Sequence, residues 1–268
     1  YWKRMEFTTE EWKILKLGCE ELGIRFLASP FSNAAVDLLE KIGVERYKIG
    51  SGEVNNFLLL EKIARTGKPV ILSSGMSSYS ELDKAVEFLK NRNVEFSILQ
   101  CTTAYPTQPE NYGLNVIGEL KARYDAKIGF SDHSAKIETC IAAAALGAEI
   151  LEFHAVFSRN SFGPDASSSL EIREIEQLVT AVKNIERARE NPVDKSDNSS
   201  FSKLKNIFEK SLAINKDLPM GHLIRFEDLE AKKPKGHGIA AENFENVIGK
   251  SLVKSKKQWD FLNEEDLG

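Results

Sequence analysis

Two histidines, each at the end of a short apolar run, are the residues of this sequence whose spacing most directly suggests chemistry. Residues 128–133 end in His133, and residues 151–154 end in His154. The alanine-rich residues 142–148 between them predict a helix stopped by a glycine. Strand, helix and strand in this order bring both imidazoles to the carboxyl ends of neighbouring parallel strands. Neutral imidazole suits a first-row divalent metal, although two unrelated polar histidines at strand ends give the same pattern.

Three carboxylates lie close to these histidines in the sequence. Asp132 precedes His133, and Glu152 lies two residues before His154. We expect both carboxylates to accept hydrogen bonds from the imidazoles and so to orient them. Asp165 follows on the loop after the last of these strands, where an exposed carboxylate commonly meets substrate.

The elements that position these groups alternate along the first 190 residues. Strict alternation of strand and helix predicts parallel strands with right-handed crossovers, and continuous apolar runs predict strands buried on both faces. A doubly wound open sheet is the competing architecture, but no GxGxxG turn follows a strand. We therefore predict an α/β fold, a (β/α)8 TIM-type barrel with about six of eight strands present. The predicted strands are residues 24–29, 46–52, 69–75, 95–102, 127–133 and 149–156, and a long helix at 169–188 closes the series.

Small polar residues gather at the carboxyl ends of the predicted strands, with one lysine among them. Lys48 lies inside a strand predicted to be buried, where an unpaired ammonium is costly. A bound anion or a catalytic amine explains such a lysine. Ser29, Ser51 and Ser73 add hydroxyl donors that suit a phosphate or carboxylate, although each could instead serve a turn or a helix cap.

Composition limits the classes of function. With 42% apolar and 28% charged residues, the 268-residue chain is typical of a globular protein, with either one barrel-sized domain or one large and one small domain. A net charge of −4 gives no general attraction to nucleic acid. No apolar run approaches the roughly 18 residues of a membrane span. Three scattered cysteines without a CxxC pair predict reduced thiols in a cytoplasmic protein.

The composition changes near residue 190. Residues 190–202 are rich in Ser, Asn, Asp and Pro, which predicts a linker. Residues 203–268 contain short apolar pieces broken by Gly and Pro, which predicts a small, β-rich domain. The expected organisation is a barrel domain at 1–189, a linker at 190–202 and a second domain at 203–268.

Five short motifs occur in order along the chain. They are YKIGSGE at 47–53, ILSSGM at 71–76, CTTAYP at 101–106, GFSDH at 129–133 and FGPD at 162–165. Together they resemble the motifs of the sialic acid synthase family, which contains the N-acetylneuraminate, legionaminate and pseudaminate synthases. The resemblance covers essentially the whole chain, and residues 211–267 resemble the small antifreeze-like (SAF) domain that ends these enzymes. It implies a TIM barrel joined to a SAF domain in a domain-swapped homodimer.

The resemblance also implies a reaction. The family condenses phosphoenolpyruvate with an N-acetylated hexose, such as N-acetylmannosamine or a diacetamido-trideoxyhexose, to give a nonulosonic acid and phosphate. A divalent metal, Mn²⁺ or Mg²⁺, is held by two histidines. By position, the metal ligands are His133 and His154. The phosphoenolpyruvate contacts are Lys48, Ser51, Ser73 and more weakly Ser29, and the sugar contacts are Tyr105 and Asp165. Lys233 replaces an arginine that reaches the partner's sugar site.

This sequence also departs from the family pattern. The family usually has about two further strands before the point where this chain begins, with a glutamate and a lysine used at the active site. We therefore expect an N-terminally truncated barrel that is inactive as written. Two alternatives stay open: a Schiff-base aldolase with Lys48 as the nucleophile, and a non-catalytic truncated barrel that acts as a binding or scaffold subunit.

Overall fold

The computed structural model describes residues 2–268, which form two compact units. The first unit ends at Asn191, and the second comprises Pro192–Gly268. Each unit has an apolar core of its own. Among the described residues, no helix combines the length and the apolar character that crossing a membrane requires.

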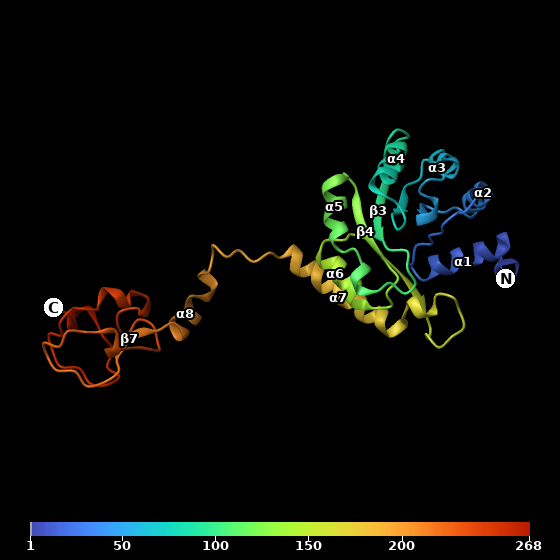
Figure 1. Cartoon of the computed structure of the whole chain (residues 1–268). Coiled ribbons are helices and arrows are strands. Elements are labelled where there is room, and N and C mark those ends of the chain that lie inside the picture. Colours follow the sequence, from blue (N-terminus) through green and yellow to red (C-terminus); the bar gives the residue numbers. More distant parts are fainter. Residues whose placement is uncertain (1) are drawn as a thin grey trace. The chain divides into compact units, whose positions relative to one another are not determined.

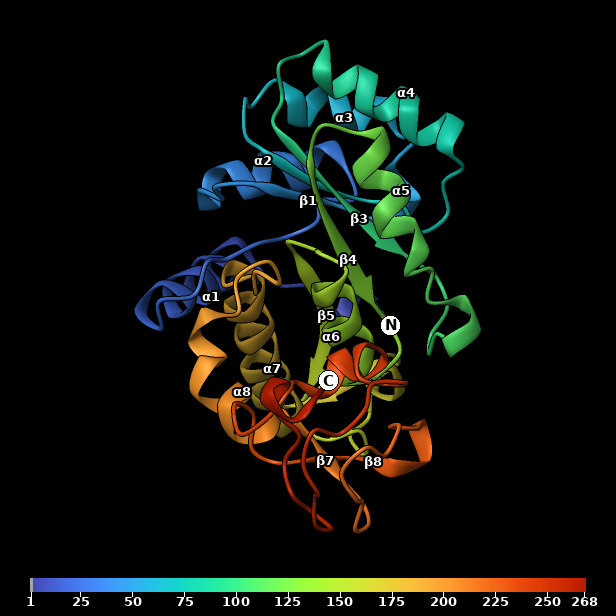
Figure 2. The same cartoon turned by 90° about the vertical axis from the view of Figure 1, so that its left-hand side faces the viewer.

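Six parallel strands form the centre of the first unit. Each strand pairs with the next one along the chain, and the sheet curls into a half-barrel (Figures 1 and 2). This sequential order excludes the doubly wound alternative, in which the order reverses at a switch point. The strands are β1 (Tyr47–Ile49), β2 (Val70–Ser73), β3 (Phe96–Cys101), β4 (Lys127–Asp132), β5 (Leu151–Val156) and β6 (Ser169–Glu171).

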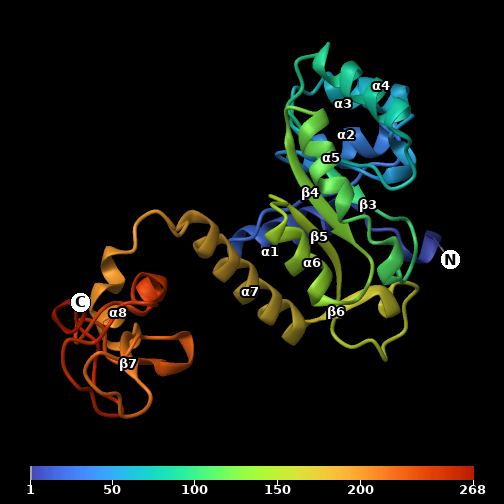
Figure 3. The ribbon, with the colours of Figure 1, turned by 60° about the vertical axis from the view of Figure 1, so that its left-hand side comes forward.

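Most of the helices bury an apolar face against the sheet, although no residue of the first helix is buried. A serine or threonine side chain caps several of them, as Ser78 caps α4. The last two helices of the unit lie side by side along β5 (Figure 3). The helices are α1 (Thr9–Glu21), α2 (Asn33–Ile42), α3 (Phe57–Ala64), α4 (Tyr79–Lys90), α5 (Asn115–Arg123), α6 (Ile137–Ala145) and α7 (Ile172–Glu190).

Two of the predicted elements differ from the structure. Residues 24–29 form no strand but only an isolated bridge between Ala28 and Tyr47. Ile24 and Leu27 are 59% and 39% exposed, so little burial favours strand pairing there. Conversely, residues 169–171 form β6 rather than the start of a helix, because they pair with β5 and Leu170 is buried.

The second unit is built around a short antiparallel pair of strands. Helix α8 (Ser202–Phe208) precedes β7 (Ser211–Ile214), which pairs with β8 (Leu229–Lys232). Isolated bridges such as that between Ala213 and Phe261 extend the pairing. Residues 191–198, which follow α7, contain no helix or strand.

A buried carboxylate fixes one turn of the second unit. Asp228 is 2% exposed, and its oxygens lie 2.7 Å from Lys216 Nζ and 2.7 Å from His222 Nε2. The backbone amide of Arg225 also donates to it. Burial alone raises the pKa of this carboxyl, but the three hydrogen bonds bring it down to about 2.

We predict that Asp228→Asn destabilises the protein by about 2 kcal/mol at pH 7. The folded pKa lies below the unfolded one, so this contribution is complete above about pH 4 and is lost as the pH falls toward 2. Calorimetric unfolding of the whole chain at pH 7 and near pH 2 measures this contribution. Glu227→Gln, an exposed neighbour, is the control. Equal unfolding temperatures for the two variants at pH 7 would contradict the prediction.

Candidate active site

A cavity of about 510 Å³ lies at the carboxyl ends of the strands of the first unit. Asp165 is close by, since its Oδ2 lies 4.0 Å from Nδ1 of His154. Lys233 belongs to the second unit. The other predicted site residues all line this one cavity: Ser29, Lys48, Ser51, Ser73, Tyr105, His133 and His154.

The two imidazoles form one end of the cavity. The ring centroids of His133 and His154 are 5.2 Å apart, and the ring of Tyr105 packs 4.3 Å from that of His133. Nδ1 of His133 lies 3.1 Å from the carbonyl oxygen of Thr102. A carbonyl only accepts, so Nδ1 carries the proton and Nε2 keeps its lone pair. Burial lowers the pKa of His133, which favours the neutral ring.

An ion pair between a buried lysine and a partly exposed glutamate forms another part of the cavity wall, which we call the lysine end. Nζ of Lys48, on β1, lies 3.1 Å from Oε1 of Glu152 on β5. Ser131 on β4 donates a hydrogen bond of 2.7 Å to the same carboxylate oxygen. Lys48 is only 9% exposed, so the pair holds one positive charge at a fixed place in the cavity wall.

These contacts correct the expected roles of two carboxylates. Glu152 makes no hydrogen bond to His154 among the described residues; it binds Lys48 and Ser131. Asp132 accepts a hydrogen bond from Ser134, while His133 is oriented by a backbone carbonyl. The sequence does contain a signal for this pairing, because a buried lysine needs a counter-charge and Glu152 lies on another strand whose carboxyl end faces the same crevice.

Hydroxyl groups shape the wall beside Lys48, and Gly75 packs against this wall without lining the cavity. Oγ of Ser73 is buried and has no hydrogen-bond partner among the described residues, which is costly unless a ligand supplies one. The backbone amide of Gly75 donates to Oγ of Ser51 at 3.1 Å. A β-carbon on Gly75 would lie 2.5 Å from Oγ1 of Thr103 and 2.7 Å from Oγ of Ser51. Only glycine therefore fits here without moving its neighbours.

The histidine end has the donors for a metal but not a complete ligand set. No group of three or more His, Cys, Asp or Glu side chains within residues 2–268 is arranged to hold an ion. Two neutral imidazoles that face one cavity fit a site in which water or substrate occupies the remaining positions.

Comparison with known proteins agrees with this geometry. The family whose sequence model matches residues 1–194 is described as the NeuB family. The chain belongs to this family. Human N-acetylneuraminate-9-phosphate synthase is 35% identical over 98% of the chain and 73% of its own length. N,N'-diacetyllegionaminic acid synthase of Campylobacter jejuni is 34% identical over 98% of the chain and 79% of its own length.

A solved structure shows the same fold as this NeuB chain. It is the N-acetylneuraminic acid (sialic acid) synthetase of Leptospira borgpetersenii in complex with citrate. The match has a TM-score of 0.71 and 36% sequence identity, and it covers 75% of this chain and 70% of that one.

We predict that Glu152→Gln raises the affinity of the cavity for anions. Lys48 then lacks its counter-charge, which costs about 1–3 kcal/mol, and added phosphate recovers part of this stability. Thermal unfolding with and without phosphate measures the effect. Glu149→Gln, at an exposed position before the same strand, is the control. If phosphate shifts the unfolding temperature of both variants equally, Lys48 is not the anion contact.

Proposed function

We propose that this NeuB-family protein is a transferase that condenses phosphoenolpyruvate with an N-acetylated hexose to give a sialic-acid-type nonulosonic acid and phosphate. The observation that carries the proposal is one cavity with two chemically different ends. One end offers a fixed ammonium and an unpaired buried hydroxyl, which suit a phosphate or carboxylate. The other offers two adjacent imidazoles.

Phosphoenolpyruvate binds at the lysine end. Lys48 supplies charge, while Ser51 and Ser73 supply hydroxyl groups that fix the orientation of the anion. Ser29 lines the same cavity and is the weaker candidate contact. Support for this assignment comes from Ser73, whose buried Oγ lacks a partner that a ligand oxygen would provide.

The sugar binds at the histidine end, where His133 and His154 hold a divalent metal, Mn²⁺ or Mg²⁺. The free Nε2 of neutral His133 supports its role as a ligand. A metal bound there supplies Lewis-acid polarisation of the aldehyde oxygen. Tyr105 and Asp165, which lie beside the two rings, contact the sugar and hold its reactive carbon toward phosphoenolpyruvate.

The reaction then joins two carbon atoms and breaks one carbon–oxygen bond. Carbon 3 of phosphoenolpyruvate attacks the sugar aldehyde, whose oxygen takes up a proton and becomes a hydroxyl group. Water then adds to the cation left at carbon 2 and releases a proton. The tetrahedral intermediate expels phosphate and leaves the 2-oxo acid. Lys48 and the serine hydroxyls stabilise the negative charge of the phosphate throughout.

The Schiff-base alternative fits the cavity less well. An aldolase needs a free amine at Lys48, whereas Nζ of Lys48 lies 3.1 Å from Oε1 of Glu152 and is occupied by this contact. Borohydride trapping with a carbonyl substrate separates the two chemistries. The sequence-based expectation of an inactive chain, or of a binding or scaffold subunit, is the opposite prediction, and the phosphate-release experiment decides between the two.

Phosphate release tests the proposal. The protein is supplied with phosphoenolpyruvate, Mn²⁺ and, in turn, N-acetylmannosamine, its 6-phosphate and diacetamido-trideoxyhexoses. We expect release that depends on one acceptor sugar and that is lost in Lys48→Met and His154→Gln. Release that no sugar stimulates, or that survives both substitutions, would refute the proposal.

We predict that Gly75→Ala raises the KM for phosphoenolpyruvate by about tenfold or more. The added methyl group collides with Thr103 and Ser51 and displaces the wall that orients the anion. Gly118→Ala, on α5 with no atom within 4 Å of the added carbon, is the matched control. Steady-state kinetics with varied phosphoenolpyruvate measure the change. Equal KM values for both variants would contradict the claim that this wall orients phosphoenolpyruvate.

We further propose that the second unit is a SAF domain that completes the partner's site in a domain-swapped homodimer. Lys233 is its sugar contact, and its Nζ lies 4.6 Å from the centroid of the Phe208 ring.

We predict that co-expressed Lys48→Met and Lys233→Met chains recover about a quarter of wild-type activity, because each mixed dimer contains one intact site. No recovery in a dimer, or full activity of a monomer in light scattering, would contradict this arrangement.

A further inference from the structure

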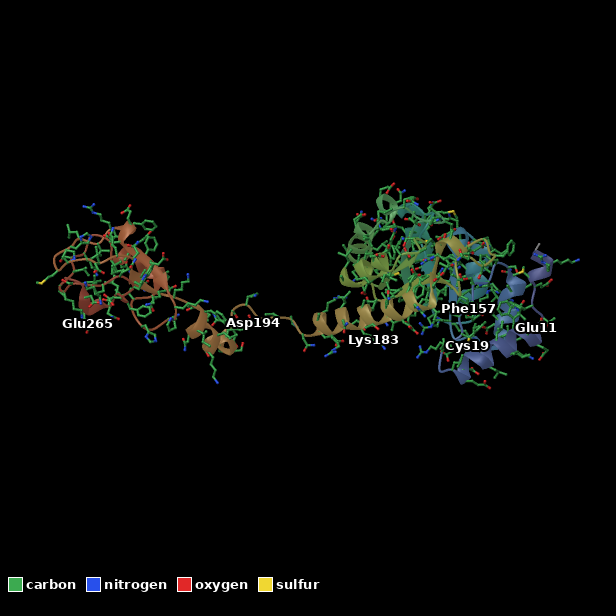
Figure 4. The ribbon with its side chains drawn as sticks, turned by 90° about the horizontal axis from the view of Figure 1, so that it is seen from below. Glu11, Cys19, Phe157, Lys183, Asp194 and Glu265 are labelled. Atoms are coloured by element: carbon green, nitrogen blue, oxygen red, sulfur yellow. The ribbon has the colours of Figure 1, made fainter. Side chains whose placement is uncertain are left out.

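The loop between β5 and β6 carries Asp165 to the cavity, and its first part has no apolar anchor. Phe157, which follows β5 and is labelled in Figure 4, is 92% exposed, and Phe162 is 91% exposed. Neither phenylalanine therefore fixes the loop by burial. The end of the loop is held by the buried Ala166 and by Oγ of Ser169, which donates to the carbonyl of Asp165 at 2.7 Å. Residues 157–164 depend instead on polar contacts with the rest of the unit.

Arg159 makes most of these contacts. Its backbone amide donates to Oε1 of Glu171 at 2.9 Å, and its Nε donates to the carbonyl of Ser169 at 3.0 Å. Its Nη2 donates to the carboxylate of Glu174 and, at 3.5 Å, to the carbonyl of Ala135. Among residues 157–164, all of them described, no other side chain forms a hydrogen bond outside the loop.

The contact with Ala135 links the loop to the histidine end of the cavity. Ala135 lies two residues after His133 and has a left-handed backbone with φ of 58°. A residue with a β-carbon adopts this conformation only when its surroundings hold it there. Ser134 holds the turn from one side through a hydrogen bond to Asp132. Arg159 holds it from the other side through a hydrogen bond to the carbonyl of Ala135.

We infer that Arg159 is a positioning residue that holds the Asp165 loop and the turn after His133 as one unit. The inference rests on the proposed function, in which both segments serve the acceptor sugar. The planar guanidinium of Arg159 forms hydrogen bonds to β6, to α7 and to the turn at the same time. A lysine ammonium on a flexible stem cannot reproduce this set. The lysine end of the cavity has no contact with this network among the described residues.

Arg159→Gln tests the inference, with Arg173→Gln as the matched control. Arg173 is exposed on α7 and makes no hydrogen bond or ion pair within the described chain. Hydrogen exchange should become faster in residues 157–168 and also in 133–136 of Arg159→Gln. The KM for the acceptor sugar should rise about tenfold or more, while that for phosphoenolpyruvate stays within about twofold. Arg159→Lys should lie between the wild type and Arg159→Gln.

Each outcome decides one claim. Unchanged exchange in either segment would overturn the coupling of the two loops, whatever the activity. Faster exchange with an equal rise in both KM values would overturn the link to the sugar. If the wild type releases no phosphate with any acceptor, the proposed function fails, while exchange still decides whether Arg159 couples the loops.

Discussion

Parallel pairing in chain order is the constraint on which the rest of the structure depends. Because β1 to β6 all run in one direction, every carboxyl end reaches the same edge of the curled sheet. Residues far apart in the sequence therefore meet there. Lys48 and Glu152 are separated by more than half of the sequence that forms the first unit, yet their charged atoms are 3.1 Å apart.

The same constraint separates the cavity into two ends with different chemistry. Lys48 on β1 and the hydroxyl of Ser73 on β2 provide charge and donors, whereas His133 and His154 come from β4 and β5. The glutamate of β5 crosses toward β1 to neutralise the lysine, which leaves the imidazoles free of a carboxylate partner on that side. An anion and a neutral sugar can thus bind side by side without competing for the same groups.

Much of this arrangement could be predicted from the sequence, because strand periodicity and terminal polar residues are local signals. The barrel-type order and the gathering of Lys48, Ser73 and both histidines followed from them. The three-residue β6 was missed because its sequence merges into the pattern of α7. Whether Glu152 pairs with Lys48 or with His154 depends on how far side chains reach across the curled sheet from β5 to β1, which spacing along the chain does not specify.

A crystal of the protein grown with Mn²⁺ and phosphoenolpyruvate, measured with anomalous scattering at the manganese edge, tests the two-ended cavity most directly. The account predicts one manganese ion bound by nitrogens of His133 and His154 at about 2 Å. It also predicts a phosphoenolpyruvate anion in contact with Lys48 and Ser73. Manganese bound away from both histidines, or the anion bound outside this cavity, would contradict the account.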